Sequence, residues 1–440
     1  MRVSRGDGLK SGLARLAICW GLMLVCMTPG WCQEVQAKKG SAVPFPPPLA
    51  ASPAPTPLAP AIHIDLGPLG YRVPRTSAPY ELSPAEGLYF VDADHILITF
   101  RIADLMPRLP DGLPSDEDRM IHAVVLELPS GRITAAANWR LHDHLQFIWP
   151  MSGGRFLVRQ RNRLMVTDAS MRLHPFLRPA MRLASVQVSQ DGKTLIVETE
   201  MERHSAEEHK RVLEQAREKK LAPPAEDVRV MVVDTERRSV IAESREPGAI
   251  PLHLIRDGYV EVVPRRWGRW ELRYVPFNGG AKSLATFSSK CEPKVDILNS
   301  DAVLVANCPS VVGGNGVMAL SLESKPLWTV GSDRNLAAPR FTASSDGGTV
   351  ALSRLKVAEP VDIRMPTVRE ANIVGQQIDL FDAASGKVRL EATAWPARVY
   401  GQDYALSPDG QKLAVLKTDK VEIFDVQATH GKPGTVASAQ

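Results

Sequence analysis

The sequence lacks a long apolar run, an excess of basic charge and a large set of cysteines. The apolar run Leu16–Met27 is shorter than the ~20 residues that a membrane-spanning helix needs. The 53 Lys and Arg residues nearly balance the 49 Asp and Glu residues, and four of the basic ones lie within residues 1–32. The composition therefore gives no support to nucleic-acid binding, and we expect no transmembrane helix in the mature chain.

The chain also lacks the short motifs of common active sites. We find no nucleophile elbow, zincin motif, EF-hand loop or Walker sequence. The Gly-rich stretch Val311–Gly316 is expected to join two strands, so it is not a phosphate loop. The sequence therefore predicts no cofactor, no metal and no catalytic residue.

The first 37 residues have the pattern of a secretory signal peptide. Four basic residues precede the apolar run, and Val35–Ala37 places small residues at a cleavage site. Cleavage after Gly30–Cys32 is a second possibility, and an uncleaved anchor is a third. We expect the protein to be periplasmic or secreted.

Residues 38–61 form a linker rich in Pro and Ala. Such a stretch cannot build a core, and it favours the extended polyproline II conformation. We interpret it as a spacer, with a docking ligand for a proline-binding domain as the alternative.

Seven apolar hairpins recur through the rest of the chain. Their tight polar turns are centred on Asp94, Gly153, Asp191, Asp257, Ser300, Asp346 and Asp409. Each hairpin is followed by a third apolar strand, and several by a fourth. A four-stranded unit of about 40–45 residues is the repeat of a β-propeller. The sequence thus predicts an all-β chain: a seven-bladed propeller of four-stranded antiparallel blades over residues 62–427, then a disordered tail, 428–440.

The last repeat resembles the WD-repeat-like propellers of bacterial secreted proteins, including the Tol-system type. The residues that carry the resemblance are Ala405–Val415, with the sequence Ala-Leu-Ser-Pro-Asp-Gly-Gln-Lys-Leu-Ala-Val, and Ile423–Asp425. The Gly-His and Trp-Asp dipeptides of eukaryotic WD repeats are absent. The resemblance implies a fold and no particular function, because propellers host many unrelated activities.

Two further expectations concern the arrangement of the blades. A strand from Ile62–Leu66 or from the segment near Tyr80–Leu82 would complete blade seven and remove an open edge. Insertions at residues 101–121, 201–227 and 355–376 follow the second strand of blades one, three and six, so all three should lie on one face. In the blade-three insertion, Ser205 and Glu208 form a capping-box pattern that predicts a short helix.

Polar residues precede the first strand of several blades on that same face. They are Glu86, His142, Asp143, His144, Arg340, Gln402 and Asp403. Together they predict a ligand site at the mouth of the central channel. Such a mouth could hold a metal or perform acid–base chemistry. The alternative, which we favour, is a hydrogen-bonded ring that ties the blades together.

The mature chain keeps two cysteines, Cys291 and Cys308, which flank one hairpin. An oxidising compartment favours a disulfide between them. A two-residue turn that pairs Leu298 with Asp301 would place the two cysteines opposite each other.

These features favour an exported, monomeric, non-catalytic binding or assembly module. We expect its partner to be a protein or a cell-envelope glycan on the face that carries the insertions. A hydrolase or lyase at the channel mouth is the alternative.

Overall fold

The computed structural model describes residues 59–72, 86–101, 119–141, 146–200, 214, 228–246, 252–265, 268–289, 291–307, 316–331, 333–361, 368–397 and 402–426. The predicted signal peptide, most of the linker, the C-terminal tail and the predicted blade-three helix except Glu214 lie outside these ranges. Within them, the structure contains no helix with the length and apolar character to cross a membrane.

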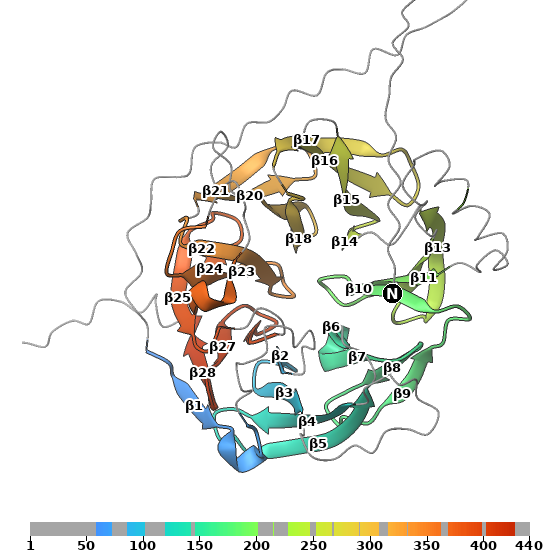
Figure 1. The fold of residues 1–440 in the computed structure, drawn as a ribbon. Coiled ribbons are helices and arrows are strands. Elements are labelled where there is room, and N and C mark those ends of the chain that lie inside the picture. The colour runs from blue at the N-terminus through green and yellow to red at the C-terminus, as the bar shows by residue number, and fades with distance from the viewer. Residues whose placement is uncertain are drawn as a thin grey trace, which may run out of the picture. The chain divides into compact units, whose positions relative to one another are not determined.

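The described strands form seven four-stranded antiparallel sheets. Figure 1 shows these sheets arranged as blades in a ring around a common axis. The predicted seven-bladed propeller is therefore confirmed, and all seven predicted hairpin turns join the first and second strands of a blade.

The strands of the first four blades follow one another in chain order, each from the ring axis outward. Blade one contains β2 (Gly87–Phe90), β3 (His95–Arg101), β4 (Arg119–Glu127) and β5 (Ile133–Leu141). Blade two contains β6 (Ile148–Met151), β7 (Arg155–Gln160), β8 (Arg163–Thr167) and β9 (His174–Leu177). Blade three contains β10 (Leu183–Val188), β11 (Thr194–Glu200), β12 (Val228–Asp234) and β13 (Ser239–Glu246). Blade four contains β14 (His253–Ile255), β15 (Gly258–Arg265), β16 (Arg269–Pro276) and β17 (Lys282–Ser288).

Blade seven departs from this order because its outer strand comes from the N-terminal end of the propeller. Blade five contains β18 (Lys294–Asn299), β19 (Ala302–Ala306), β20 (Gly316–Ser321) and β21 (Pro326–Gly331). Blade six contains β22 (Leu336–Ala343), β23 (Thr349–Val357), β24 (Ile373–Asp382) and β25 (Val388–Ala394). Blade seven contains β26 (Tyr404–Leu406), β27 (Lys412–Leu416), β28 (Lys420–Asp425) and, outermost, β1 (Ile62–Asp65). The short 3-10 helices are η1 (Gly67–Leu69), η2 (Ser152–Gly154) and η4 (Glu370–Asn372).

The core consists of seven apolar clusters, one between each pair of neighbouring blades. Each blade is therefore covered on both faces, and the middle of its second strand is mostly apolar. In β19, for example, all five residues from Ala302 to Ala306 are buried. Burial of this kind, at about 25 cal/mol per Å² of apolar area, is the main force that stabilises the ring.

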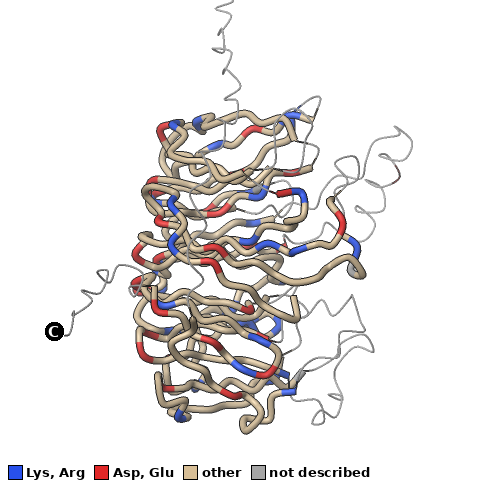
Figure 2. The backbone as a smooth tube through the Cα atoms, turned by 90° about the vertical axis from the view of Figure 1, so that its left-hand side faces the viewer, with Lys and Arg blue, Asp and Glu red and all other residues tan. Residues whose placement is uncertain are grey.

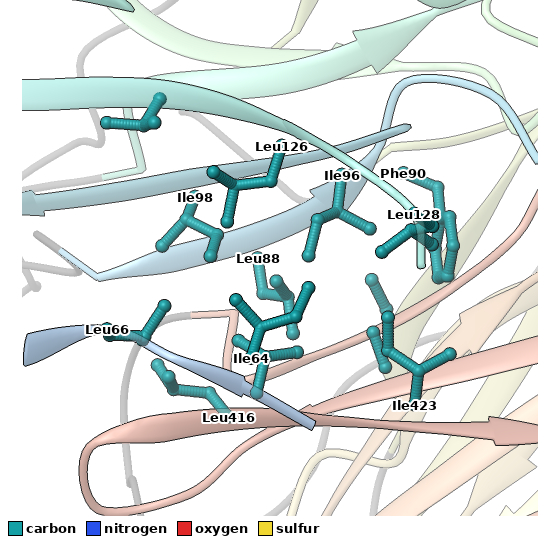
Figure 3. Close-up of a cluster of buried hydrophobic side chains, with 14 of the residues drawn as sticks. Ile64, Leu66, Leu88, Phe90, Ile96, Ile98, Leu126, Leu128, Leu416 and Ile423 are labelled. Atoms are coloured by element: carbon teal, nitrogen blue, oxygen red, sulfur yellow. The ribbon is translucent and has the colours of Figure 1, made fainter. Parts of the chain in front are cut away.

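The ring closes where β1 pairs with β28, with Ile62 opposite Ile423 and Ile64 opposite Val421. Of the two segments considered for closure, Ile62–Leu66 makes it. Figure 3 shows Ile64 and Leu66 lying between Leu416 and Ile423 of blade seven and the apolar residues of blade one. The outer strand of blade seven thus packs directly against the first blade, and the edge of β28 is covered.

The alternation of strand direction gives the ring two different faces. The turns between the first and second strands, and between the third and fourth, lie on one face, which we call the turn face. The connections between the second and third strands lie on the other, which we call the insertion face. The three predicted insertions connect β3 to β4, β11 to β12 and β23 to β24, so their strand ends lie on the insertion face.

One predicted strand register is wrong. In blade five Val295 faces Val305 and Asn299 faces Ala302, so the expected pairing of Leu298 with Asp301 does not occur. A bulge between Ile297 and Asn299 leaves Leu298 unpaired, and its side chain is fully buried against blade six. The described pairing ends at Lys294 and Ala306, so it reaches neither cysteine, and Cys308 lies outside the described residues.

Charged residues of both signs are mixed along the ring. Figure 2 shows Lys and Arg interspersed with Asp and Glu on the same strands and turns.

Candidate functional site

Two of the predicted channel-mouth residues form an ion pair between blades six and seven. The guanidinium of Arg340 donates from Nη2 to Oδ1 of Asp403 over 2.7 Å. The Asp403 side chain is completely buried, and that of Arg340 is 25 % exposed. Asp403 immediately precedes β26, while Arg340 follows an irregular register in β22 between Ala337 and Arg340. This irregularity directs the guanidinium toward blade seven.

Tyr404 extends this pair into a small network. Its hydroxyl donates to the Arg340 carbonyl oxygen over 3.3 Å, and the guanidinium lies 5.8 Å from the centre of its ring. Burial raises the pKa of the Tyr404 hydroxyl to about 12. Burial lowers the pKa of Arg340, but the charge of Asp403 raises it, and the balance lies above the ordinary value. Arg340 therefore keeps its positive charge and the Tyr404 hydroxyl stays protonated at any physiological pH.

Gln402 and Glu86 contribute through the main chain. The Gln402 carbonyl accepts a hydrogen bond of 2.7 Å from the Leu88 N–H, and its own N–H donates to the Glu86 carbonyl over 3.4 Å. The Gln402 side chain donates to the Tyr404 carbonyl over 2.8 Å. These contacts join the inner strands of blades seven and one.

The three remaining predicted residues, His142, Asp143 and His144, lie outside the described part of the chain. The structure therefore brings Arg340, Asp403, Gln402 and the Glu86 main chain together at neighbouring blades. The geometry is that of a tie between blades, because the Arg340–Asp403 pair, the Tyr404 hydroxyl and the Gln402 main chain each bond to a neighbouring blade.

Two charged residues of blade five were missed by the sequence analysis. Asp296 is half-buried on β18, and burial raises the pKa of its carboxyl to about 6. Burial of the Lys294 ammonium lowers its pKa, and the charge of Arg340 lowers it further. Both residues alternate with buried Val295 and Ile297 in an ordinary strand pattern, so nothing in the local sequence indicated that burial shifts their pKa values.

Among the described residues, no group of three or more His, Cys, Asp or Glu side chains could hold a metal ion. No Ser or Cys beside a general base is found in this network either, so the described contacts assemble no nucleophile of the usual kind. The half-buried carboxyl of Asp296 is the group there whose pKa suits proton transfer near neutral pH.

The turn face holds two features that the sequence analysis missed: hydrogen bonds that cross the ring, and a cavity. Both are built from residues that it identified only as parts of turns. Gln190, in the turn between β10 and β11, donates from its amide to the Ser344 carbonyl over 2.6 Å and to the Leu298 carbonyl over 3.3 Å. Blade three is thereby tied across the ring to blades five and six.

Beside this tie lies a cavity of about 750 Å³. Its lining comes from turns of blades one, two, three, six and seven. Only the three-dimensional arrangement could reveal it, because its members are spread from Phe90 to Asp409.

No protein-family model matches the chain, and no curated protein sequence matches it. Solved structures share its general shape at low identity. An acylaminoacyl peptidase of Pyrococcus horikoshii is 14% identical with a TM-score of 0.46, over 77% of this chain and 51% of that one. The chain therefore spans about half the length of that peptidase.

This chain matches two other solved structures over almost their entire length. The β-propeller domain of the Trilobed protease from Pyrococcus furiosus is 11% identical with a TM-score of 0.44, over 78% of this chain and 98% of that one. A Kuenenia stuttgartiensis hydrazine synthase chain is 10% identical with a TM-score of 0.41, over 81% and 99%. At this level of similarity the comparisons say nothing about activity.

Proposed function

We propose that this chain is an exported, non-catalytic β-propeller that binds a protein or a cell-envelope glycan through its insertion face. The observation that carries the proposal is the placement of the strand ends. The long connections of blades one, three and six all start and finish on that face, on a scaffold with seven buried interfaces. Long loops on a rigid scaffold are the usual carriers of recognition.

The polar network on this face supports a binding role over a catalytic one. Arg340, Asp403 and Gln402 use their described hydrogen bonds to hold neighbouring blades together. A rigid rim of this kind presents the loops in a fixed arrangement, which lowers the entropy cost of binding.

Site-specific photo-crosslinking in the producing cell tests the proposal. A photoreactive amino acid is placed at Arg101 or Glu359, on the insertion face, and at Ser385, exposed on the turn face between β24 and β25. We expect a defined adduct from the first two positions and none from Ser385. An adduct formed only from Ser385 would refute the assignment.

A hydrolase or lyase remains the second candidate, and one observation favours it. Asp296 is a half-buried carboxyl with a pKa of about 6, which suits a general acid or base. Turnover of ester, peptide or glycoside substrates by the purified chain, lost in Asp296→Asn, would establish it. Equal turnover by the two proteins would point to a contaminant.

A further inference from the structure

The turn-face cavity combines an acidic rim with an apolar floor. Its volume of about 750 Å³ falls in the range of small-ligand sites. The carboxylates of the lining are those of Asp92, Asp168, Asp191 and Asp409. The apolar part comes from Phe90, Val91, Ala93, Pro150, Met151, Ala169 and Pro408.

The rim carboxylates keep oxygens available to a ligand. Oδ1 of Asp191 accepts from the Ser189 hydroxyl over 2.6 Å and from the Lys193 N–H over 3.1 Å. Oδ1 of Asp409 makes the equivalent contacts with Ser407 and Gln411. In both turns the described contacts fall on Oδ1, so Oδ2 is left for solvent or a ligand.

The cations around the cavity do not balance its acids. Arg155 is in the lining, and its guanidinium donates to the carbonyl and hydroxyl of Ser152. His95 lies 3.0 Å from Asp92 and compensates that one carboxylate when it is protonated. Lys412, close by, binds Asp94. An excess of negative charge therefore stays at Asp168, Asp191 and Asp409.

The separation of the carboxylates and the apolar lining of the cavity indicate which class of ligand fits. Among the described residues these carboxylates form no group that could hold a metal ion. The aromatic ring of the lining, Phe90, is only 7 % exposed, so it offers no stacking platform for a sugar. An ammonium or guanidinium on an apolar stem suits both parts, because the stem can lie on Pro150 and Pro408 while the head reaches the rim.

We propose that this cavity binds an organic cation, namely an ammonium or guanidinium group carried on an apolar stem. Two sources share this chemistry: a Lys or Arg side chain of a peptide, and a free alkyl diamine. The site is separate from the partner surface proposed for the insertion face, so either can fail without the other.

Calorimetric titration of the purified full chain at low ionic strength tests the proposal. The probes are 1,5-diaminopentane, the acetyl-methylamides of Lys and Arg, and the acetyl-methylamide of norleucine as the neutral analogue. We expect saturable binding of the cations, weakened by salt, and none of the neutral analogue. Binding of the amino-acid amides alone indicates a peptide source, and equal binding of the diamine indicates a small molecule.

Asp191→Asn combined with Asp409→Asn should weaken cation binding roughly fivefold to tenfold, since it removes two solvent-exposed carboxylate charges that attract the ligand. Asparagine keeps the Oδ1 acceptor, so both turns should still fold. Asp346→Asn is the matched control, because Asp346 occupies the same position in the blade-six turn but is not in the lining.

Ala169→Lys supplies a second test that leaves the turns intact. Ala169 is exposed in the lining, so a lysine there places a competing cation in the cavity. We expect it to abolish binding. No saturable binding at millimolar concentration, equal binding of the norleucine analogue, or an equal loss in Asp346→Asn would overturn the proposal.

Discussion

The amide of Gln190 in blade three and the main-chain oxygen of Ser344 in blade six are joined across the ring by a hydrogen bond of 2.6 Å. The two residues are 154 positions apart in the chain. Each belongs to a hairpin turn in which a Ser hydroxyl and an Asp carboxylate are hydrogen-bonded, Ser189 with Asp191 and Ser344 with Asp346. Rigid turns of this kind allow a single side chain to bridge the ring axis at the turn face.

Gln190→Ala removes both cross-ring hydrogen bonds. We expect a loss of about 1–2 kcal/mol in the free energy of unfolding, since each hydrogen bond contributes about 0.5–1.5 kcal/mol. Hydrogen exchange should quicken in the turns at 189–193 and 344–348, and not in β19. Unchanged exchange in the blade-six turn would show that the bridge does not constrain it.

Arg340→Met should destabilise the protein by about 3 kcal/mol, because it leaves the buried Asp403 carboxylate without its partner. The double variant Arg340→Met with Asp403→Leu should recover much of this loss, since no buried charge remains. Chemical denaturation of the two single variants and the double variant measures the coupling. A double variant as unstable as the sum of the single ones would contradict the ion pair.

Asp296 and His253 should give opposite pH dependences that largely cancel. Burial raises the pKa of Asp296 to about 6, so its ionisation opposes folding above pH 6 and this cost disappears as the pH falls toward 4. Burial lowers the pKa of His253 to about 4, so stability is lost as the pH falls from about 6.5 to 4. Each effect is on the order of 3 kcal/mol, since one pKa unit corresponds to about 1.4 kcal/mol.

Asp296→Asn should therefore be more stable than the parent at pH 8 and should lose stability toward pH 4. His253→Gln should show the reverse slope, gaining stability over the same interval. Urea denaturation at pH 8, 6 and 4 gives both slopes. Parallel curves for the two variants would mean that neither group is buried as described.

A disulfide between Cys291 and Cys308 stays a prediction. In blade five Lys294 faces Ala306, so the two strands from which the cysteines extend are still paired three residues after Cys291 and two before Cys308. A bridge over this short loop would add about 3 kcal/mol. Thiol titration of exported, denatured, unreduced protein should find no reactive thiol on the mature chain, and two would exclude the bridge.

The seven-bladed ring could be predicted from the sequence because each blade repeats the same local pattern of polar turns and apolar strands. Polar turns such as Ser407–Gly410 and apolar strands such as Ala302–Ala306 can be read without knowing their neighbours. The blade-five register was predicted wrongly because Leu298 occupies a bulge that depends on packing against blade six.

The sites were harder to predict because they join distant parts of the chain. Arg340 and Asp403 could be placed at one rim, since both enter a first strand. The burial of Asp296 and the hydrogen bonds of Gln190 to carbonyls of blades five and six depend on how the blades are arranged, which no local pattern encodes.

The pairing of β1 with β28 also limits when blade seven can be completed during synthesis. Ile62 precedes blade one in the chain and its partner Ile423 follows blade six, so blade seven cannot be completed until the other six blades have been made. Contacts between such distant residues form late, because closing a long loop must precede them. A chain released before residue 420 would lack β28 and therefore part of the apolar surface on which Ile64 and Leu66 pack. Its ring would stay open. β1 can therefore complete the ring only in a chain that has been synthesised as far as β28.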